Sequence, residues 1–172
     1  VHATPGNLNN AIGLPLTLCG LPMETDTAIL EMGANAPGEI RELIAMAPAA
    51  QRIITSIGYA HTEGFGSIEG VRRAKSEIAE SADRDTQVIV PYTERTHLSV
   101  DAHPGRVATF GEEPGADVRV VAYQAAAPSG ARVELIGLGR VAQVDLGLPG
   151  RHNARNLAAA IATLWLSGLD LR

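Results

Sequence analysis

The sequence is poor in residue types that define several classes of protein. Among its 172 residues there is one cysteine, Cys19, so no internal disulfide framework can form, and we expect a reducing compartment, the cytoplasm. Two Phe and one Trp leave little for base stacking, and a net charge of −5 offers no basic surface to a nucleic-acid backbone. We therefore expect no nucleic-acid partner.

No hydrophobic run is long enough to cross a membrane. The longest mostly apolar stretch, residues 157–169, is shorter than the roughly 20 residues that a bilayer requires and has no signal-peptide features. A chain of 172 residues, 45% hydrophobic and 19% charged, suits one globular domain. Because it begins with Val1 and stops just after a helix-end signal at Gly168, we expect it to be a piece of a longer protein.

Hydrophobic patterning predicts an α/β fold. Continuous apolar runs at 27–34 and 52–58 predict strands that are buried on both faces of a parallel sheet. Residues 37–46 predict a helix with Pro37 in its first turn, and a second helix starts at Ser67. The later elements are strands at 86–92 and 106–111 with a possible helical turn between them, three antiparallel strands at 118–125, 131–138 and 140–148, and a helix at 151–168. The order predicts a mostly parallel, doubly wound, Rossmann-like sheet with an appended three-stranded antiparallel meander.

One lysine lies where the pattern predicts burial. In a helix that starts at Ser67, a step of about 100° per residue places Lys75 in the middle of an apolar arc. The arc consists of Ile68, Val71, Ala74, Ile78 and Ala79. A buried ammonium group is costly unless it is paired, neutralised or chemically changed. The alternative is that the stem is buried and the charged end reaches water.

Three polar side chains follow the predicted strands and would meet at one edge of the sheet. Glu31 ends the first buried strand, His61 follows the second, and Lys75 is on the next helix. Ligands bind at the carboxyl ends of strands in open α/β sheets, and these groups could together hold a cation and a phosphate. The alternatives are a strand-end carboxylate that accepts backbone N–H groups and a loop histidine with local hydrogen bonds.

Residues 64–70, with the sequence GFGSIEG, come close to the glycine pattern of dinucleotide-binding folds. The third glycine is one position late, and the following predicted strand ends in Tyr92 where that pattern needs an acidic residue. These differences argue against a nicotinamide site.

Four blocks, in order along nearly the whole chain, resemble signature segments of the Mur ligases. They read TPGNLNNAIGLPLTL (4–18), AILEMGANAPGEI (28–40), AHTEGFGSIEGVRRAKSEI (60–78) and LPGRHNARNLAAA (148–160). The resemblance is to those ligases that join D-alanyl-D-alanine to UDP-N-acetylmuramoyl-tripeptide for peptidoglycan. It implies the central ATP-binding domain of a three-domain enzyme, residues 1–172, with a sheet of the P-loop type. It also implies an acyl phosphate intermediate.

The resemblance also implies roles for individual residues. Lys75 matches a lysine that carbon dioxide converts to a carbamate, and His61 matches a second ligand of the same magnesium ion. Glu31 matches the ligand of a second magnesium ion, which bridges the β- and γ-phosphates of ATP. All three residues would be both metal ligands and catalytic residues.

The remaining implied contacts are made by amides and one imidazole. Asn153 and Asn156 match residues that hydrogen-bond adenine, and His152 lies beside them; from position alone, Asn153 could equally be a helix cap. Asn7, Asn9 and Asn10 match the loop that faces the substrate, although without the resemblance the segment is a cluster of turn residues. The cofactor-binding candidates are thus His152, Asn153 and Asn156, and the substrate-binding candidates are Asn7, Asn9 and Asn10.

The sequence also departs from the family pattern. It contains no glycine-rich run ending in Gly-Lys-Thr or Gly-Lys-Ser, the phosphate-binding loop that should precede residue 4. We therefore expect the chain to begin after that loop and to lack the N-terminal uridine-nucleotide domain and the C-terminal domain. The alternative function is a non-catalytic Mur-like module for nucleotide binding or protein interaction.

The 172-residue chain should bind Mg-ATP only weakly. Adenine contacts without a phosphate cradle leave most of the nucleotide's charge unpaired. Isothermal titration calorimetry measures this directly. A dissociation constant in the low micromolar range, about −8 kcal/mol, would contradict the expectation.

Overall fold

The computed structural model describes residues 1–58, 65–80, 82–98, 100–126 and 129–168. The chain forms two compact units that alternate along the sequence. The first consists of Val1–Ala49 and Ile57–Ser81, and the second of Ala50–Ser56 and Ala82–Arg172. Within the described ranges, no helix is both long and apolar enough to span a membrane.

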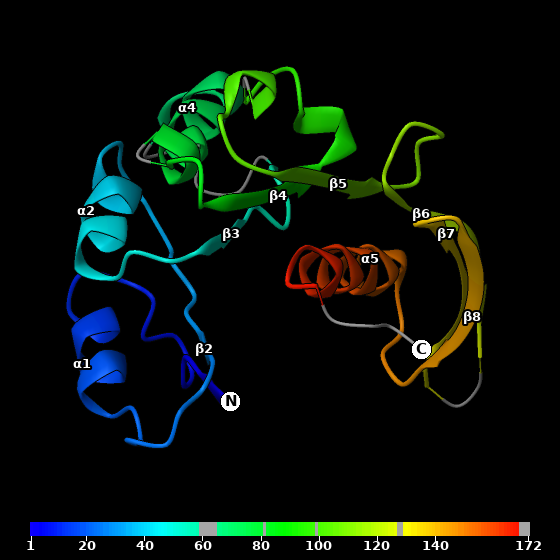
Figure 1. Ribbon diagram of the computed structural model, residues 1–172, viewed down its shortest axis with the longest axis horizontal. Coiled ribbons are helices and arrows are strands. Elements are labelled where there is room, and N and C mark those ends of the chain that lie inside the picture. Colours follow the sequence, from blue (N-terminus) through cyan, green and yellow to red (C-terminus); the bar gives the residue numbers. More distant parts are fainter. Residues whose placement is uncertain (59–64, 81, 99, 127–128, 169–172) are drawn as a thin grey trace. The chain divides into compact units, whose positions relative to one another are not determined.

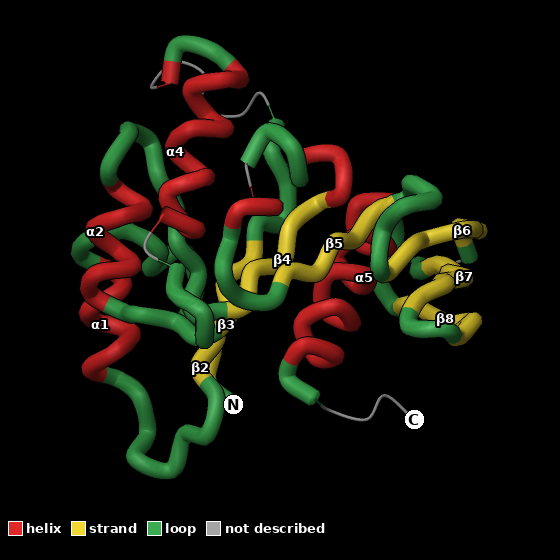
Figure 2. Tube along the Cα trace, turned by 45° about the horizontal axis from the view of Figure 1, so that its top comes forward, coloured by secondary structure: helices red, strands yellow, loops and turns green. Residues whose placement is uncertain are grey.

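The second unit is built on one mixed sheet (Figure 1). Four parallel strands come first, and two antiparallel strands complete the sheet (Figure 2). The order across the sheet is β3 (Gln51–Ile53), β4 (Gln87–Pro91), β5 (Val107–Gly111), β6 (Val118–Ala125), β7 (Ala131–Gly137) and β8 (Arg140–Leu146). The short 3-10 helices η1 (Tyr92–Glu94) and η2 (Val100–Ala102) connect β4 to β5.

One long helix, α5 (Arg151–Leu166), packs along this sheet. Its buried side is made mostly of alanines, which allow the helix backbone to lie close to the strands. The strand residues facing it form the core of the unit, including Ile89, Ala108, Phe110, Val118, Val133 and Leu135. Burial of this apolar surface is the main stabilising term of the unit.

Side chains from three segments bind the C-terminal end of α5. Gln51 Nε2 donates to the carbonyl of Thr163 at 3.1 Å, and both Gln87 Nε2 and Arg106 Nη1 donate to the carbonyl of Leu166 at 3.0 Å. These donors lie at or before the starts of β3, β4 and β5. The helix therefore runs antiparallel to these strands, and its N-terminus lies toward their carboxyl ends.

The first unit contains a two-stranded parallel sheet and three helices. The strands are β1 (His2–Ala3) and β2 (Ala28–Ile29), and the helices are α1 (Gly13–Cys19), α2 (Glu39–Met46) and α4 (Ile68–Glu80). Its core consists of Leu14, Ile40, Leu43, Ile44 and Ala47. The predicted helical spacing of the α2 residues is thus confirmed.

The α/β class and the mostly parallel sheet with antiparallel strands are confirmed, but the strand predicted at 27–34 is wrong in its burial. Only Ala28–Ile29 forms a strand, and both residues are exposed. Beyond it, the alternate residues Leu30, Met32 and Ala34 pack on the core of the first unit. The segment is therefore buried on one face only, the face that carries Leu30, Met32 and Ala34.

Three further differences concern element boundaries. Helix α1 was not predicted, and α2 begins at Glu39, not in the turn of Pro37, because Gly38 adopts φ +94° as the preceding residue. The strand predicted at 52–58 is shorter, Gln51–Ile53. The predicted meander is present, but β6 also pairs in parallel with β5, so it continues the main sheet.

The hairpin between β7 and β8 contains a strained residue. Leu138 has φ +59° and is followed by Gly139 at φ +75°, so both central turn residues have the positive φ of a type I′ turn. A leucine is unfavourable in this region, whereas asparagine tolerates it.

Leu138→Asn should therefore raise the free energy of unfolding by about 0.5–1 kcal/mol, because Asn-Gly suits this turn. Urea unfolding of the protein measures the change. The matched control is Leu148→Asn, the same substitution at an exposed leucine without a positive φ, which should bring no gain. Equal effects of the two substitutions would show that the turn stores no strain.

Candidate functional site

The asparagine-rich segment before α1 has a structural part and an exposed part. Asn10 Oδ1 accepts hydrogen bonds from the backbone N–H groups of Ile12 at 3.1 Å and Gly13 at 2.9 Å. Asn10 therefore organises the start of α1, which agrees with its interpretation as a turn residue. Asn7 is exposed, and its carbonyl accepts a hydrogen bond from the N–H of Asn9 at 2.8 Å.

Asn9 holds the carboxylate of Glu31. Asn9 Nδ2 donates to Glu31 Oε1 at 2.7 Å, and the N–H of Gly33 donates to the carbonyl of Asn9 at 2.8 Å. A Cβ atom at Gly33 would lie 3.0 Å from Asn9 Nδ2, so a side chain there would press on this amide. The N–H of Glu31 donates to Thr4 Oγ1 at 2.8 Å. Glu31 is therefore an exposed acid fixed at both its backbone and its side chain.

Lys75 is half-buried on α4, but it lies at the edge of the buried face and not at its centre. The most buried residues of the helix are Val71, Ala74 and Glu77, at 2%, 1% and 4% exposure. The predicted arc is thus rotated, because the buried side extends to Glu77, while Ile78 is partly buried and packs on the core of the first unit. Burial lowers the pKa of the Lys75 ammonium from its ordinary value, which favours the neutral amine.

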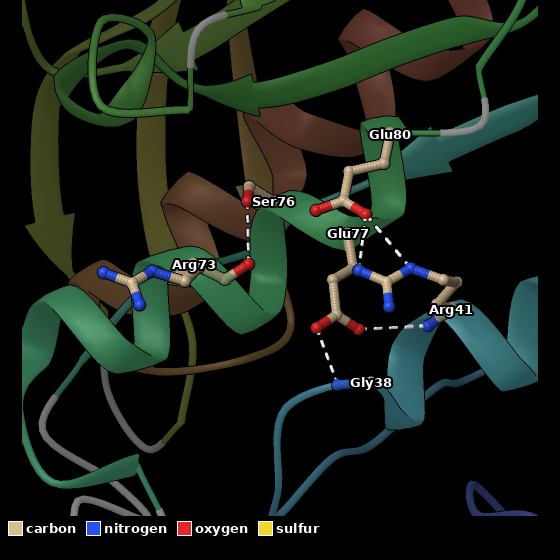
Figure 3. A network of polar contacts seen from close by, with 6 residues as sticks. All are labelled: Gly38, Arg41, Arg73, Ser76, Glu77 and Glu80. Atoms are coloured by element: carbon tan, nitrogen blue, oxygen red, sulfur yellow. Dashed lines mark hydrogen bonds and ion pairs between the residues drawn. The ribbon is translucent and has the colours of Figure 1, made fainter.

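Glu77 lies on this buried face and joins α4 to α2 (Figure 3). Its carboxylate accepts hydrogen bonds from the backbone N–H of Gly38 at 2.7 Å and of Arg41 at 3.2 Å. These groups lie in the first turn of α2, where N–H groups have no partner within the helix and the helix dipole favours an anion. One turn further on, the Arg41 guanidinium binds Glu80 at 2.7 Å.

Sequence reasoning missed Glu77. The spacing of Ala74, Glu77 and Ile78 places the acid beside the apolar arc, and a charged residue in that position is a signal of a buried partner. The partner, however, is the backbone of α2, about 36 residues earlier. No local pattern in the sequence identifies these backbone N–H donors.

The candidate adenine-binding residues gather at the start of α5. His152 and Asn156 are exposed and Asn153 is half-buried, all within the first turns of the helix. Asn153 is not the cap, since Gly150 occupies the N-cap position and Asn153 lies in the first turn of the helix. Instead, Asn153 Nδ2 donates to the carbonyl of Pro149 at 2.7 Å.

The candidate residues are divided between the two units. Glu31, Lys75 and the three asparagines belong to the first unit, whereas His152, Asn153 and Asn156 belong to the second. His61 lies outside the described residues. Within the part of the chain that is described, no three His, Cys, Asp or Glu side chains form a metal-binding group. The assignments of metal and nucleotide ligands therefore remain predictions.

Residues 1–164 match the family model of the Mur ligase middle domain, so the chain belongs to this family. A relative from Bacillus subtilis, UDP-N-acetylmuramoyl-tripeptide–D-alanyl-D-alanine ligase, is 35% identical over 94% of this chain and 34% of its own length. The crystal structure of MurF from Acinetobacter baumannii matches with a TM-score of 0.89 at 33% identity, over 98% of this chain and 37% of that one. The MurF of Thermotoga maritima, solved with ADP, shares the fold at a TM-score of 0.88 and 24% identity, over 99% of this chain and 40% of that one. The chain spans about a third of the length of such relatives.

Glu77→Gln should destabilise the protein by about 1–3 kcal/mol, because a buried acceptor of two backbone N–H groups loses its charge and one of its oxygens. Glu80→Gln is the matched control on the same helix. Its ion pair with Arg41 is exposed, so we expect a loss of at most about 0.5 kcal/mol. Urea unfolding compares the two variants, and equal losses would contradict the capping role of Glu77.

Proposed function

We propose that this chain is the central domain of an ATP-dependent ligase that joins D-alanyl-D-alanine to UDP-N-acetylmuramoyl-tripeptide in peptidoglycan synthesis. The observation that carries the proposal is the family match over residues 1–164 together with relatives of that name at 32–35% identity. In this proposal, the other parts of the ligase, including its phosphate-binding loop, would lie outside residues 1–172.

The reaction is the formation of an amide at the cost of ATP. The terminal carboxylate of the tripeptide attacks the γ-phosphate, which forms an acyl phosphate and releases ADP. The amine of D-alanyl-D-alanine then attacks the acyl carbon and displaces phosphate through a tetrahedral intermediate. Magnesium supplies charge compensation for the phosphoryl group when it is bound.

The first unit contains a carboxylate suited to bind magnesium. Glu31 is exposed and held by Asn9, and this hydrogen bond occupies only one carboxylate oxygen, Oε1. Hard cations such as magnesium prefer carboxylate oxygens. We assign Glu31 to one ion, and His61 and Lys75 to the other. Asn7, Asn9 and Asn10 would line the substrate side, with Asn10 acting through the start of α1.

Lys75 fits the role of a carbamate. It is half-buried, and its pKa is lowered because burial disfavours the ammonium form. The neutral amine is the species that reacts with carbon dioxide, and the product is a carboxylate on a long stem. This modification would convert a cation at the edge of the buried face into an anionic ligand for magnesium.

The start of α5 fits the adenine ring. The side-chain amides of Asn153 and Asn156 each offer a donor and an acceptor, which matches the hydrogen-bonding edge of adenine. His152 lies beside them. The ADP complex of the Thermotoga maritima protein, which has the same fold, supports a nucleotide as the ligand.

Lys75→Ala in the complete ligase should lower kcat by at least about a hundredfold, since it removes an anionic metal ligand. Acetate or formate should restore part of the activity, because a small carboxylate can occupy the vacated position. If the charged end of Lys75 merely reaches water, the alanine variant should show nearly normal turnover, and added carboxylate should have no effect.

Labelled bicarbonate gives an independent measurement. Lys75 is the only lysine of the printed sequence, so ¹³C NMR of this chain should show one side-chain carbamate signal, apart from any signal of the N-terminal amine. Lys75→Arg is the control, because a guanidinium stays protonated and forms no carbamate. Loss of activity without rescue or labelling would mean that Lys75 acts as a cation, and a fully active alanine variant would mean that its charged end merely reaches water.

A further inference from the structure

The start of α5 is bound to the sheet by a tyrosine of β6. The N–H of Gly150, the residue before the helix, donates to Tyr123 Oη at 2.7 Å. Gly150 adopts φ +100°, and a Cβ atom there would lie 2.5 Å from Cε1 of His152. The imidazole therefore lies close to the backbone of Gly150, so a shift of Gly150 would change the surroundings of His152.

An ion pair binds the next residue of the helix. Arg151 Nη1 lies 2.7 Å from Glu112 Oε2, and the Arg151 guanidinium lies 5.8 Å from the centre of the Tyr123 ring. Glu112 follows β5 directly, and its carbonyl accepts a hydrogen bond from Arg119 Nε at 3.1 Å. Arg155, one turn along the helix, lies 3.8 Å from the same carboxylate. Two neighbouring strands thus hold the first turn of α5.

We propose that Tyr123 and the Glu112–Arg151 ion pair are positioning residues for adenine-nucleotide binding: they hold the first turn of α5 so that His152, Asn153 and Asn156 face the base together. The inference rests on the proposed function, which assigns adenine to these three side chains. It adds residues that do not touch the nucleotide themselves.

The helical geometry separates the two sets of residues. His152, Asn153 and Asn156 lie between about 100° and 200° around the helix axis from Arg151, whereas Arg155 lies only about 40° from it. The arginines therefore point to Glu112, and the candidate base-binding side chains form a different face. Fixing a helix at its first turn orders this face before the ligand arrives, and this lowers the entropic cost of binding.

The remainder of α5 is held independently. Ala154, Ala158 and Ala162 are buried in the core, and the C-terminal carbonyls accept hydrogen bonds from Gln51, Gln87 and Arg106. Loss of the Tyr123 hydroxyl should therefore loosen only the first turn. Because the helix stays packed, the expected effect is on nucleotide affinity and not on the folding of the domain.

Tyr123→Phe tests the inference in the complete ligase, since it keeps the ring beside Arg151 and removes the acceptor of the Gly150 N–H. We expect the KM for ATP to rise about 3- to 10-fold, the effect of one hydrogen bond, with kcat unchanged. The KM values for D-alanyl-D-alanine and the tripeptide nucleotide should not change. The preference for ATP over GTP should fall, because a loosened amide face discriminates between bases less well.

Arg151→Gln should also raise the KM for ATP, and the double variant should show less than the product of the two single effects, because both act on one turn. The matched control is Arg132→Gln, which removes the exposed ion pair between Arg132 and Asp145 at 2.8 Å on β7 and β8. It should leave every kinetic constant unchanged.

Two results would overturn the inference. In one, Tyr123→Phe lowers the melting temperature but leaves the KM for ATP unchanged; in the other, it raises the KM of all three substrates equally. Asn156→Ala separates this failure from that of the proposed adenine site. If Asn156→Ala raises the KM for ATP and Tyr123→Phe does not, only the positioning role is wrong. If Asn156→Ala has no effect on it, the adenine assignment is wrong and the inference with it.

Discussion

Helix ends that are bound by side chains from distant segments are the constraint on which both units depend. A helix leaves its first N–H groups and its last carbonyls without partners, and burying them unpaired is costly. Glu77 supplies acceptors for the first turn of α2, while Gln51, Gln87 and Arg106 supply donors for the last turn of α5. Each contact joins segments that the sequence separates widely, so satisfying a helix end also fixes the tertiary arrangement within its unit.

These contacts also decide where the functional side chains lie. Glu77 binds α4 to the first turn of α2, and Lys75 lies at the edge of the same buried face, half-buried, where its pKa is lowered. The donors at the C-terminal end of α5 orient the helix so that its amide-bearing first turns lie toward the carboxyl ends of the parallel strands. That edge is where open α/β sheets bind ligands. The same polar contacts thus contribute to stability and to the placement of the candidate site.

The parts of the fold that periodicity describes could be predicted from the sequence. The strands β4 to β8 and the helices α4 and α5 lie close to their predicted bounds, because each has a clear apolar face or run. Residues 27–34 could not be predicted correctly, since an apolar run does not show whether one layer or two will cover it. Three hydrogen-bonded contacts were not predictable for another reason. They are those of Glu77 with α2, of Tyr123 with Gly150 and of Asn9 with Glu31. Their partners are backbone groups or side chains brought close only by the folded chain.

The distribution of basic residues is consistent with a role for Lys75 as a reactive amine and not merely as a cation in an ion pair. Of the 14 Lys and Arg residues, Lys75 is the only lysine. Arginines make the exposed ion pairs with Glu80, Asp145 and Glu112, where a permanently charged, multiply donating group is suitable. A guanidinium could also place its stem on the edge of a buried helix face, so burial alone does not require an amine there. What an arginine cannot do is lose its proton and react as a nucleophile, and partial burial favours that change in a lysine. The one amine side chain of the sequence therefore occupies a position where burial lowers its pKa and so increases the share of the neutral amine, the form that the proposed carbamate requires.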